Sequence, residues 1–141
     1  MNSKTDALKP FRDALDDAAI SSQIRSFEGG IEILGQGGIR KDTSHSPPGA
    51  SIDVEIDQAF DNVAYILARS NFDWSDVTHV DSYHVPESPE AMLLATNAVV
   101  SQLRERMPRH RPTWNCTIVP ALGDSRMRVE VSVRASRPQP I

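Results

Sequence analysis

Cysteine and aromatic residues are scarce in this chain of 141 residues, which has one cysteine and 6% aromatic residues. Positive charge is not in excess, because the formal net charge is −4. One cysteine cannot form an internal disulfide, and most zinc sites built from cysteine and histidine need more than one thiol. The negative charge argues against a nucleic-acid partner, because nucleic-acid-binding domains usually present a basic surface. We therefore expect an intracellular protein that folds without a disulfide or a structural zinc.

Long apolar runs are missing as well. No segment approaches the ~20 consecutive apolar residues that a membrane-spanning helix needs. The first residues, MNSKTDALKPFRDALDDAAISS, contain no apolar core typical of a signal peptide, and they carry acidic residues that transit peptides avoid. These absences predict a cytoplasmic protein that makes no membrane contact.

The length and the ordinary composition, with 39% hydrophobic and 24% charged residues, predict one domain that can bury a core. We divide the chain into an N-terminal extension (1–19), a single domain (20–136) and a frayed C-terminal tail (137–141). Apolar residues at helical spacing over about 8–19 predict that the extension forms one short amphipathic helix.

Apolar periodicity and turn residues divide the domain into strands and helices. In chain order we expect two strands within 23–38 joined at Gly29-Gly30, a helix within 51–71, a strand within 76–85, a helix within 88–107 and strands within 113–122 and 126–135. The segment GDS between the last two strands is typical of a hairpin. This order predicts an α+β domain with a mixed sheet and two helices on one face.

The last predicted strand alternates between apolar and polar residues. One face carries Met127, Val129, Val131, Val133 and Ala135, and the other carries Arg126, Arg128, Glu130, Ser132 and Arg134. A half-polar sheet face in a small domain is either solvated or packed against another subunit.

Two residues are candidates for chemistry. Cys116 lies two residues after Trp114, which places both on one face of a strand. A free cysteine is most often a small buried residue, and no motif here supplies the base that a nucleophile needs. Glu130 either forms an ion pair with nearby arginines or acts as a general acid/base with a pKa raised by burial. If the last two strands pair, Trp114, Cys116 and Glu130 can line one pocket.

A basic cluster, RERMPRHR (104–111), precedes the strand that contains Trp114. Such a cluster is usually a solvated helix end, where cations interact favourably with the helix dipole. It can also recruit the carboxylate or phosphate of a ligand, because arginine binds these groups with charge-assisted hydrogen bonds. Both interpretations stay open at this point.

Several segments, taken together, resemble one known family. They are LGQGGI (34–39), AFDNVAYILARSNFDWSDVTHVDSYHV (59–85), TNAVVSQL (96–103) and, most specifically, RPTWNCTIVPALGDSRMRVEVSVRA (111–135). The segments and the order of elements resemble the Rid family of reactive intermediate deaminases, also called the YjgF family. The resemblance covers roughly residues 20 to 136.

The resemblance implies a chorismate-mutase-like α+β fold and a homotrimer with ligand pockets in the clefts between subunits. It implies a hydrolase that converts reactive imines or enamines of small molecules into 2-keto acids and ammonia, with no metal or cofactor. Some members of the family are described as endoribonucleases, but the acidic composition argues against RNA as a partner.

Individual residues carry over from the family by position. Cys116 matches the active-site cysteine position, and Glu130 matches the glutamate that positions the attacking water. Gly35 matches a glycine whose backbone faces the pocket, and Asn97 matches an asparagine on the pocket side of the second helix.

Trp114 departs from the family pattern, because the position belongs to the arginine that binds the substrate carboxylate. Tryptophan has no charge and a single N–H donor, so a carboxylate loses a charge-assisted contact of typically ~1.5–3 kcal/mol. Activity on simple 2-imino acids should therefore be weak. Either Arg111 or Arg109 supplies the missing cation, or the substrate is apolar or aromatic and stacks on the indole.

The loss of the arginine leaves two alternatives to an imine or enamine deaminase. One is a non-catalytic trimer that binds a metabolite or a partner. The other is a pathway-specific cyclase or isomerase that uses Glu130 as an acid/base on the same scaffold.

Overall fold

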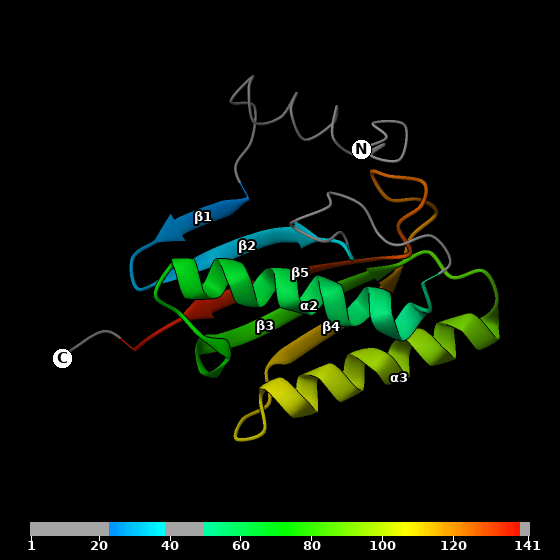
Figure 1. Cartoon of the computed structure of the whole chain (residues 1–141). Coiled ribbons are helices and arrows are strands. Elements are labelled where there is room, and N and C mark those ends of the chain that lie inside the picture. Colours follow the sequence, from blue (N-terminus) through cyan, green and yellow to red (C-terminus); the bar gives the residue numbers. More distant parts are fainter. Residues whose placement is uncertain (1–22, 39–49, 139–141) are drawn as a thin grey trace.

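The computed structural model describes residues 23–38 and 50–138, and Figure 1 presents its architecture. The helix expected over residues 8–19 and the end of the tail (139–141) lie outside these ranges. The elements are β1 Ile24–Phe27, β2 Gly30–Gln36, α2 Ile52–Arg69, a 3-10 turn Trp74–Asp76, β3 Val77–His84, α3 Pro89–Arg106, β4 Thr113–Ile118 and β5 Val129–Ser136. The predicted sequence of strands and helices is therefore confirmed.

The five strands form one mixed sheet in the order β1-β2-β5-β3-β4. β3 and β4 are parallel, and the other neighbouring strands are antiparallel. The expected hairpin between the last two strands is wrong, because β3 lies between β4 and β5. The alternating apolar residues of β5 suit a central strand, and both of its edges are taken by β2 and β3. The segment 119–128 carries the chain from edge strand β4 to that central position.

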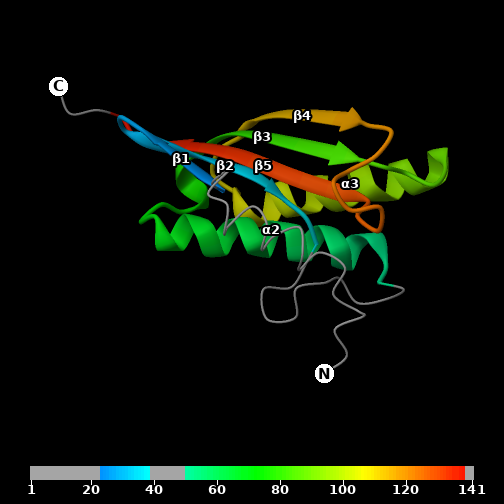
Figure 2. The same cartoon turned by 90° about the horizontal axis from the view of Figure 1, so that it is seen from above.

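Both helices cover the same face of the sheet, as Figure 2 shows and as the amphipathic patterns predict. The apolar stripe of α2 packs on the sheet and against α3, and the core side chains include Ile33, Ile56, Phe60, Val63, Leu67, Val80, Val99, Val131 and Val133. Burial of each such side chain stabilises the fold by roughly 1.5–3 kcal/mol. Within the described residues, no helix is long and apolar enough to cross a membrane.

Local sequence explains where the elements begin. Ser88 Oγ accepts a hydrogen bond from Ala91 N at 3.0 Å, and Pro89 follows as the first residue of α3. The turn between β1 and β2 is displaced by one residue from the predicted Gly29-Gly30, because Gly30 already pairs with Phe27. Gly29 has a φ of 83°, a value that glycine adopts without strain.

Among residues 23–38 and 50–138, no helix covers the second face of the sheet, and we call it the bare face (Figure 2). It is half-polar as predicted, but Arg126 and Arg128 do not belong to it, because β5 begins only at Val129. Arg128 instead reaches the first turn of α2, where its Nε donates to Glu55 Oε1 at 2.8 Å.

Candidate functional site

Glu130 and Gly35 meet on the bare face. Glu130 lies on the central strand β5, and Gly35 lies on the neighbouring β2, where the pairing register shifts between Ile33 and Gln36. A Cβ added to Gly35 would lie 2.2 Å from Glu130 Cδ and 2.5 Å from its Oε2. Only glycine therefore leaves room for the carboxyl at this point. The structure brings together two of the residues that the sequence singled out.

The arginines near Glu130 do not pair with it. They pair with other carboxylates, Arg126 with Asp124, Arg128 with Glu55 and Arg134 with Glu32. Among the described residues Glu130 has no ion-pair partner, and burial of its half-exposed side chain raises the pKa of its carboxyl. This geometry favours the acid/base interpretation of Glu130 over the ion-pair interpretation.

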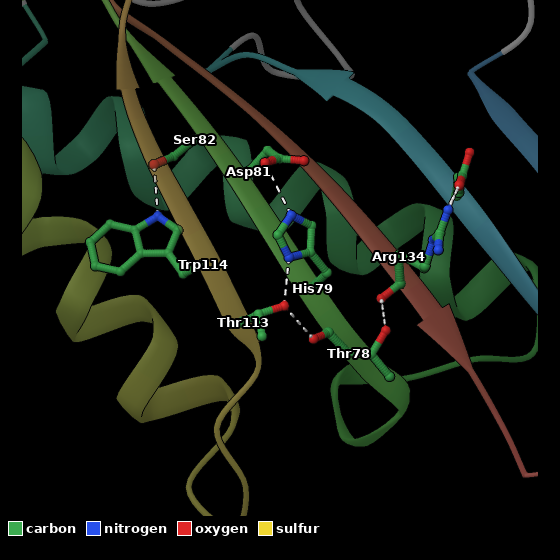
Figure 3. A network of polar contacts seen from close by, with 8 residues as sticks. Thr78, His79, Asp81, Ser82, Thr113, Trp114 and Arg134 are labelled. Atoms are coloured by element: carbon green, nitrogen blue, oxygen red, sulfur yellow. Dashed lines mark hydrogen bonds and ion pairs between the residues drawn. The ribbon is translucent and has the colours of Figure 1, made fainter.

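Trp114 lies on the helix side of edge strand β4, directly opposite Val80 of β3. Its Nε1–H donates to Ser82 Oγ at 2.9 Å (Figure 3), and Ser82 Oγ lies 2.9 Å from His84 Nε2. The only hydrogen-bond donor of the indole is therefore used within the chain. A substrate carboxylate gains no hydrogen bond from Trp114, and only its ring face and edge remain for a ligand.

A cavity of about 660 Å³ lies beside Trp114, between the C-terminal turn of α3 and the loop that leads into β4. Arg104, Arg109 and Arg111 line it together with apolar side chains, and none of the three forms an ion pair with a described residue. His110 Nε2 lies 2.8 Å from Val77 O and fastens the loop to the sheet. The sequence-based suggestion that Arg109 or Arg111 lies near Trp114 agrees with this arrangement.

Cys116 and Asn97 are placed apart from these groups. Cys116 is exposed on edge strand β4, opposite Ser82, so within one chain it is not the small buried residue that a free cysteine most often is. Asn97 is exposed on α3. Neither residue lines the cavity beside Trp114 or the two further cavities described below.

The candidate residues therefore form two groups on opposite sides of the sheet. Glu130 and Gly35 lie on the bare face, whereas Trp114 and Cys116 lie on the helix side of β4. The predicted pocket that joins Trp114, Cys116 and Glu130 does not exist within one chain, because β3 separates their strands.

On the bare face, residues of β3 and the edge strand β4 form a connected polar network (Figure 3). His79 Nε2 lies 3.1 Å from Asp81 Oδ1, and His79 Nδ1 lies 2.6 Å from Thr113 Oγ1. A shallow cavity of about 300 Å³ lies over His79 and Asp81, and Tyr83 and Arg134 also line it. Within residues 23–38 and 50–138, no cluster of three or more His, Cys, Asp or Glu side chains could hold a metal ion.

Sequence reasoning did not identify Ser82 and His84 as part of a site. Ser82 is fully buried and His84 is 1% exposed, and both face the helices. Their spacing of two residues in a strand was a usable signal, because it places two polar groups on a face that is otherwise apolar. His84 Nδ1 is buried without a hydrogen-bond partner. Burial lowers the pKa of the His84 imidazole, so the ring is neutral.

Known structures share this architecture. The YjgF gene product of E. coli is 17% identical, with a TM-score of 0.72 over 84% of this chain and 88% of that chain. E. coli TdcF with bound serine is 16% identical, with the same TM-score of 0.72 and the same coverage, 84% and 88%. Yeast Mmf1 is 22% identical, with a TM-score of 0.70 over 85% and 89%. At these identities the likeness establishes the fold.

Sequence comparison identifies the family. No curated protein matches the chain in sequence. The family model described as endoribonuclease L-PSP, in contrast, matches residues 12–137, which is most of the chain. The α+β fold, with a five-stranded mixed sheet and two helices, agrees with that match. The chain therefore belongs to the endoribonuclease L-PSP family, which is the YjgF/Rid family.

Proposed function

We propose that this protein hydrolyses reactive imines or enamines to a carbonyl compound and ammonia. The observation that carries the proposal is the Glu130 carboxyl, which is half-buried over Gly35, has no ion-pair partner among the described residues and has a raised pKa. A carboxyl of this kind exchanges protons at a pH closer to neutrality than an ordinary glutamate, as general acid/base catalysis requires.

The chemistry is the addition of water to a C=N bond. Glu130 takes a proton from the water as the water oxygen bonds to the electrophilic carbon, and the nitrogen takes up a proton from solvent to give a carbinolamine. Glu130 then returns its proton to the nitrogen, the C–N bond breaks, and ammonia leaves with the electron pair. Loss of the hydroxyl proton leaves the carbonyl. An enamine enters the same route after its carbon is protonated to the imine. The net reaction consumes one water and needs no oxidant or reductant.

The substrate we propose is larger than a simple 2-imino acid. Trp114 offers an aromatic surface but no free donor, because its N–H already binds Ser82. Arg109 and Arg111 line the adjacent cavity and suit an anionic group at some distance from the reacting carbon. An aromatic or extended imine with a remote acidic group satisfies both features.

A complete site requires two copies of the chain in this proposal. Glu130 and Gly35 lie on the bare face, whereas Trp114 and Cys116 lie on the helix side of an edge strand. We propose a homotrimer in which the bare face of one copy packs beside the β4 edge of the next, so that a cleft holds both groups. The serine bound in TdcF is consistent with a site for small metabolites in this fold.

The test uses a flavin-dependent amine oxidase to generate imines without a 2-carboxylate in solution from 2-phenylethylamine or 3-methylbutylamine, and an amino-acid oxidase to generate the 2-imino acid of alanine for comparison. Capture of the imine by semicarbazide competes with hydrolysis, so an active protein lowers the yield of semicarbazone. We expect the wild-type protein to act best on the aromatic imine. We expect Glu130→Gln to reduce the rate about 100-fold or more, the usual contribution of general acid/base catalysis.

The matched control is Glu105→Gln, since Glu105 is exposed on α3 in the helix layer. This variant should keep the wild-type rate. A wild-type protein that accelerates no imine hydrolysis, or a Glu130→Gln variant with full activity, would contradict the proposal.

A binding protein without catalysis is the second candidate. The observation in its favour is Trp114 at the position of the carboxylate-binding arginine of the family. Calorimetry with stable aromatic acids such as phenylpyruvate distinguishes the two candidates. Binding of the acid without any acceleration of imine hydrolysis would favour the binding protein.

A further inference from the structure

A second cavity, of about 360 Å³, lies on the helix side of the sheet, between the N-terminal ends of α2 and α3. Its walls combine apolar and charged side chains, namely Ile52, Leu94, Ala95, Asp53, Glu87 and Arg128. His84 also lines it and is 1% exposed, with its Nδ1 buried and without a partner. A buried polar atom beside a cavity indicates that a group from outside the described structure completes its hydrogen bonding.

The hydrogen bonds of Ser82 determine what His84 presents to this cavity. Trp114 Nε1–H can only donate, so Ser82 Oγ accepts from it at 2.9 Å. The hydroxyl hydrogen of Ser82 then has one acceptor among the described residues, His84 Nε2, also at 2.9 Å. The neutral imidazole therefore carries its hydrogen on Nδ1. The unpartnered atom is an N–H donor, and it calls for an oxygen acceptor.

The charges around the cavity restrict which acceptor fits. Asp53 and Glu87 contribute two carboxylates, whereas Arg128 is already engaged, with its Nη2 donating to Ala50 O at 2.7 Å and its Nε to Glu55. The Asp53 carboxylate also accepts from Ser51 and from the first backbone N–H groups of α2, which lowers its pKa. A simple anion in this cavity would therefore face repulsion from both carboxylates.

We propose that this cavity binds a free apolar α-amino acid. The ligand carboxylate accepts the hydrogen bond of His84 Nδ1, and the ammonium group lies near Asp53 and Glu87. The apolar side chain contacts Ile52 and Leu94. A zwitterion of this kind supplies an acceptor to His84 and a cation to the carboxylates at once. The cavity is separate from the arginine-lined one beside Trp114, so the inference goes beyond the proposed function.

Calorimetry on the full chain tests the proposal, with L-leucine as the probe. Two analogues each lack one charged group, 4-methylpentanoate without the ammonium and 3-methylbutylamine without the carboxylate. We expect leucine to bind once per chain, and each analogue to bind about 10-fold more weakly or worse, the loss expected for one charge-assisted hydrogen bond.

Two variants test which side chains contact the carboxylate and the ammonium group of leucine. His84→Leu should weaken leucine binding about 10-fold or more. Because His84 is buried, Glu87→Gln provides a second variant at an exposed position, and it should weaken leucine but not 4-methylpentanoate. NMR adds an independent readout, since leucine should shift the indole N–H signal of Trp114 through Ser82 and leave that of Trp74 in place.

Three results would overturn the inference. They are no leucine binding by the wild-type protein, equal affinity for leucine and both analogues, and loss of leucine binding in Arg111→Ala, which would place the ligand in the cavity beside Trp114. The imine-hydrolysis assay is read separately. Failure of either experiment therefore leaves the other proposal standing.

Discussion

At the scale of single residues, the candidate chemistry depends on two close contacts. Glu130 keeps its carboxyl on the bare face only because Gly35 has no Cβ. Trp114 is unable to bind a carboxylate through its N–H because Ser82 already accepts that hydrogen. In both cases one neighbouring atom determines what the functional side chain can do.

The raised pKa of Glu130 predicts how stability depends on pH. Below pH 4.5, the ordinary value, the carboxyl is neutral in the folded and unfolded states, and its contribution to stability is fully present. As the pH rises through the raised folded pKa, the unfolded chain ionises more readily and the wild-type protein loses stability. Glu130→Gln has no such titration. The free energy of unfolding of the wild type, relative to this variant, should therefore fall as the pH rises.

Urea unfolding of both proteins at a series of pH values, from below pH 4.5 to about pH 8, measures this difference. Other titrating groups cancel because they are common to both proteins. A difference that stays constant, or that grows in favour of the wild type with rising pH, would contradict the environment assigned to Glu130.

At the scale of elements, a buried ion pair joins the first turn of α2 to the start of β5. Glu55 is 3% exposed, and its carboxylate accepts from Arg128 N and Arg128 Nε, each at 2.8 Å. The pair Glu32–Arg134, which links β2 and β5 on the bare face, is more exposed. The two pairs have the same chemistry in different environments.

Removal of the carboxylate charge should destabilise the protein more at the Glu55–Arg128 pair than at the Glu32–Arg134 pair. Glu55→Gln should lower the free energy of unfolding by about 2 kcal/mol, because it leaves Arg128 without its buried counter-charge. Glu32→Gln is the matched control and should cost about 0.5 kcal/mol or less, as exposed pairs do. Urea unfolding at neutral pH gives both values. Equal losses would show that the Glu55 pair does not hold the two elements together.

At the scale of the whole molecule, α2 and α3 lie on one face of the sheet, and no other described helix covers the bare face (Figure 2). The residues suited to chemistry are divided between the bare face and the edge strand β4. A site that uses both groups therefore needs a second copy of the chain. This division and the half-polar character of the bare face support assembly between copies, and the number three in the proposal comes from the family resemblance.

Light scattering coupled to size exclusion should give the mass of three chains at micromolar concentration. Ser132→Arg places a long charged side chain on the bare face and should yield a monomer with an unchanged circular dichroism spectrum. Glu105→Arg on the outer side of α3 is the control, and it should remain a trimer. A monomeric wild-type protein, or a trimeric Ser132→Arg variant, would contradict assembly through the bare face.

The sequence by itself determined the elements, their order and the alternation of faces along the strands, but it extended the last strand too far and so misplaced Arg126 and Arg128. Alternation with a period of two and apolar stripes at helical spacing are local properties, and they predicted the helices, the polar bare face and the opposite orientations of His79 and His84. The family followed from the segments around Gly35, Asn97 and Cys116, and the family match agrees with it.

Only the tertiary structure decided which strands are neighbours and which polar groups meet. The position of β3 between β4 and β5 depends on contacts between segments distant in sequence. Because of this position, Glu130 lies apart from Trp114 and Cys116. Hydrogen-bond partners of buried atoms likewise depend on positions within a few tenths of an ångström. The Trp114–Ser82–His84 chain of hydrogen bonds, and the pairing of Arg126, Arg128 and Arg134 with carboxylates other than Glu130, therefore emerged only from the packed molecule.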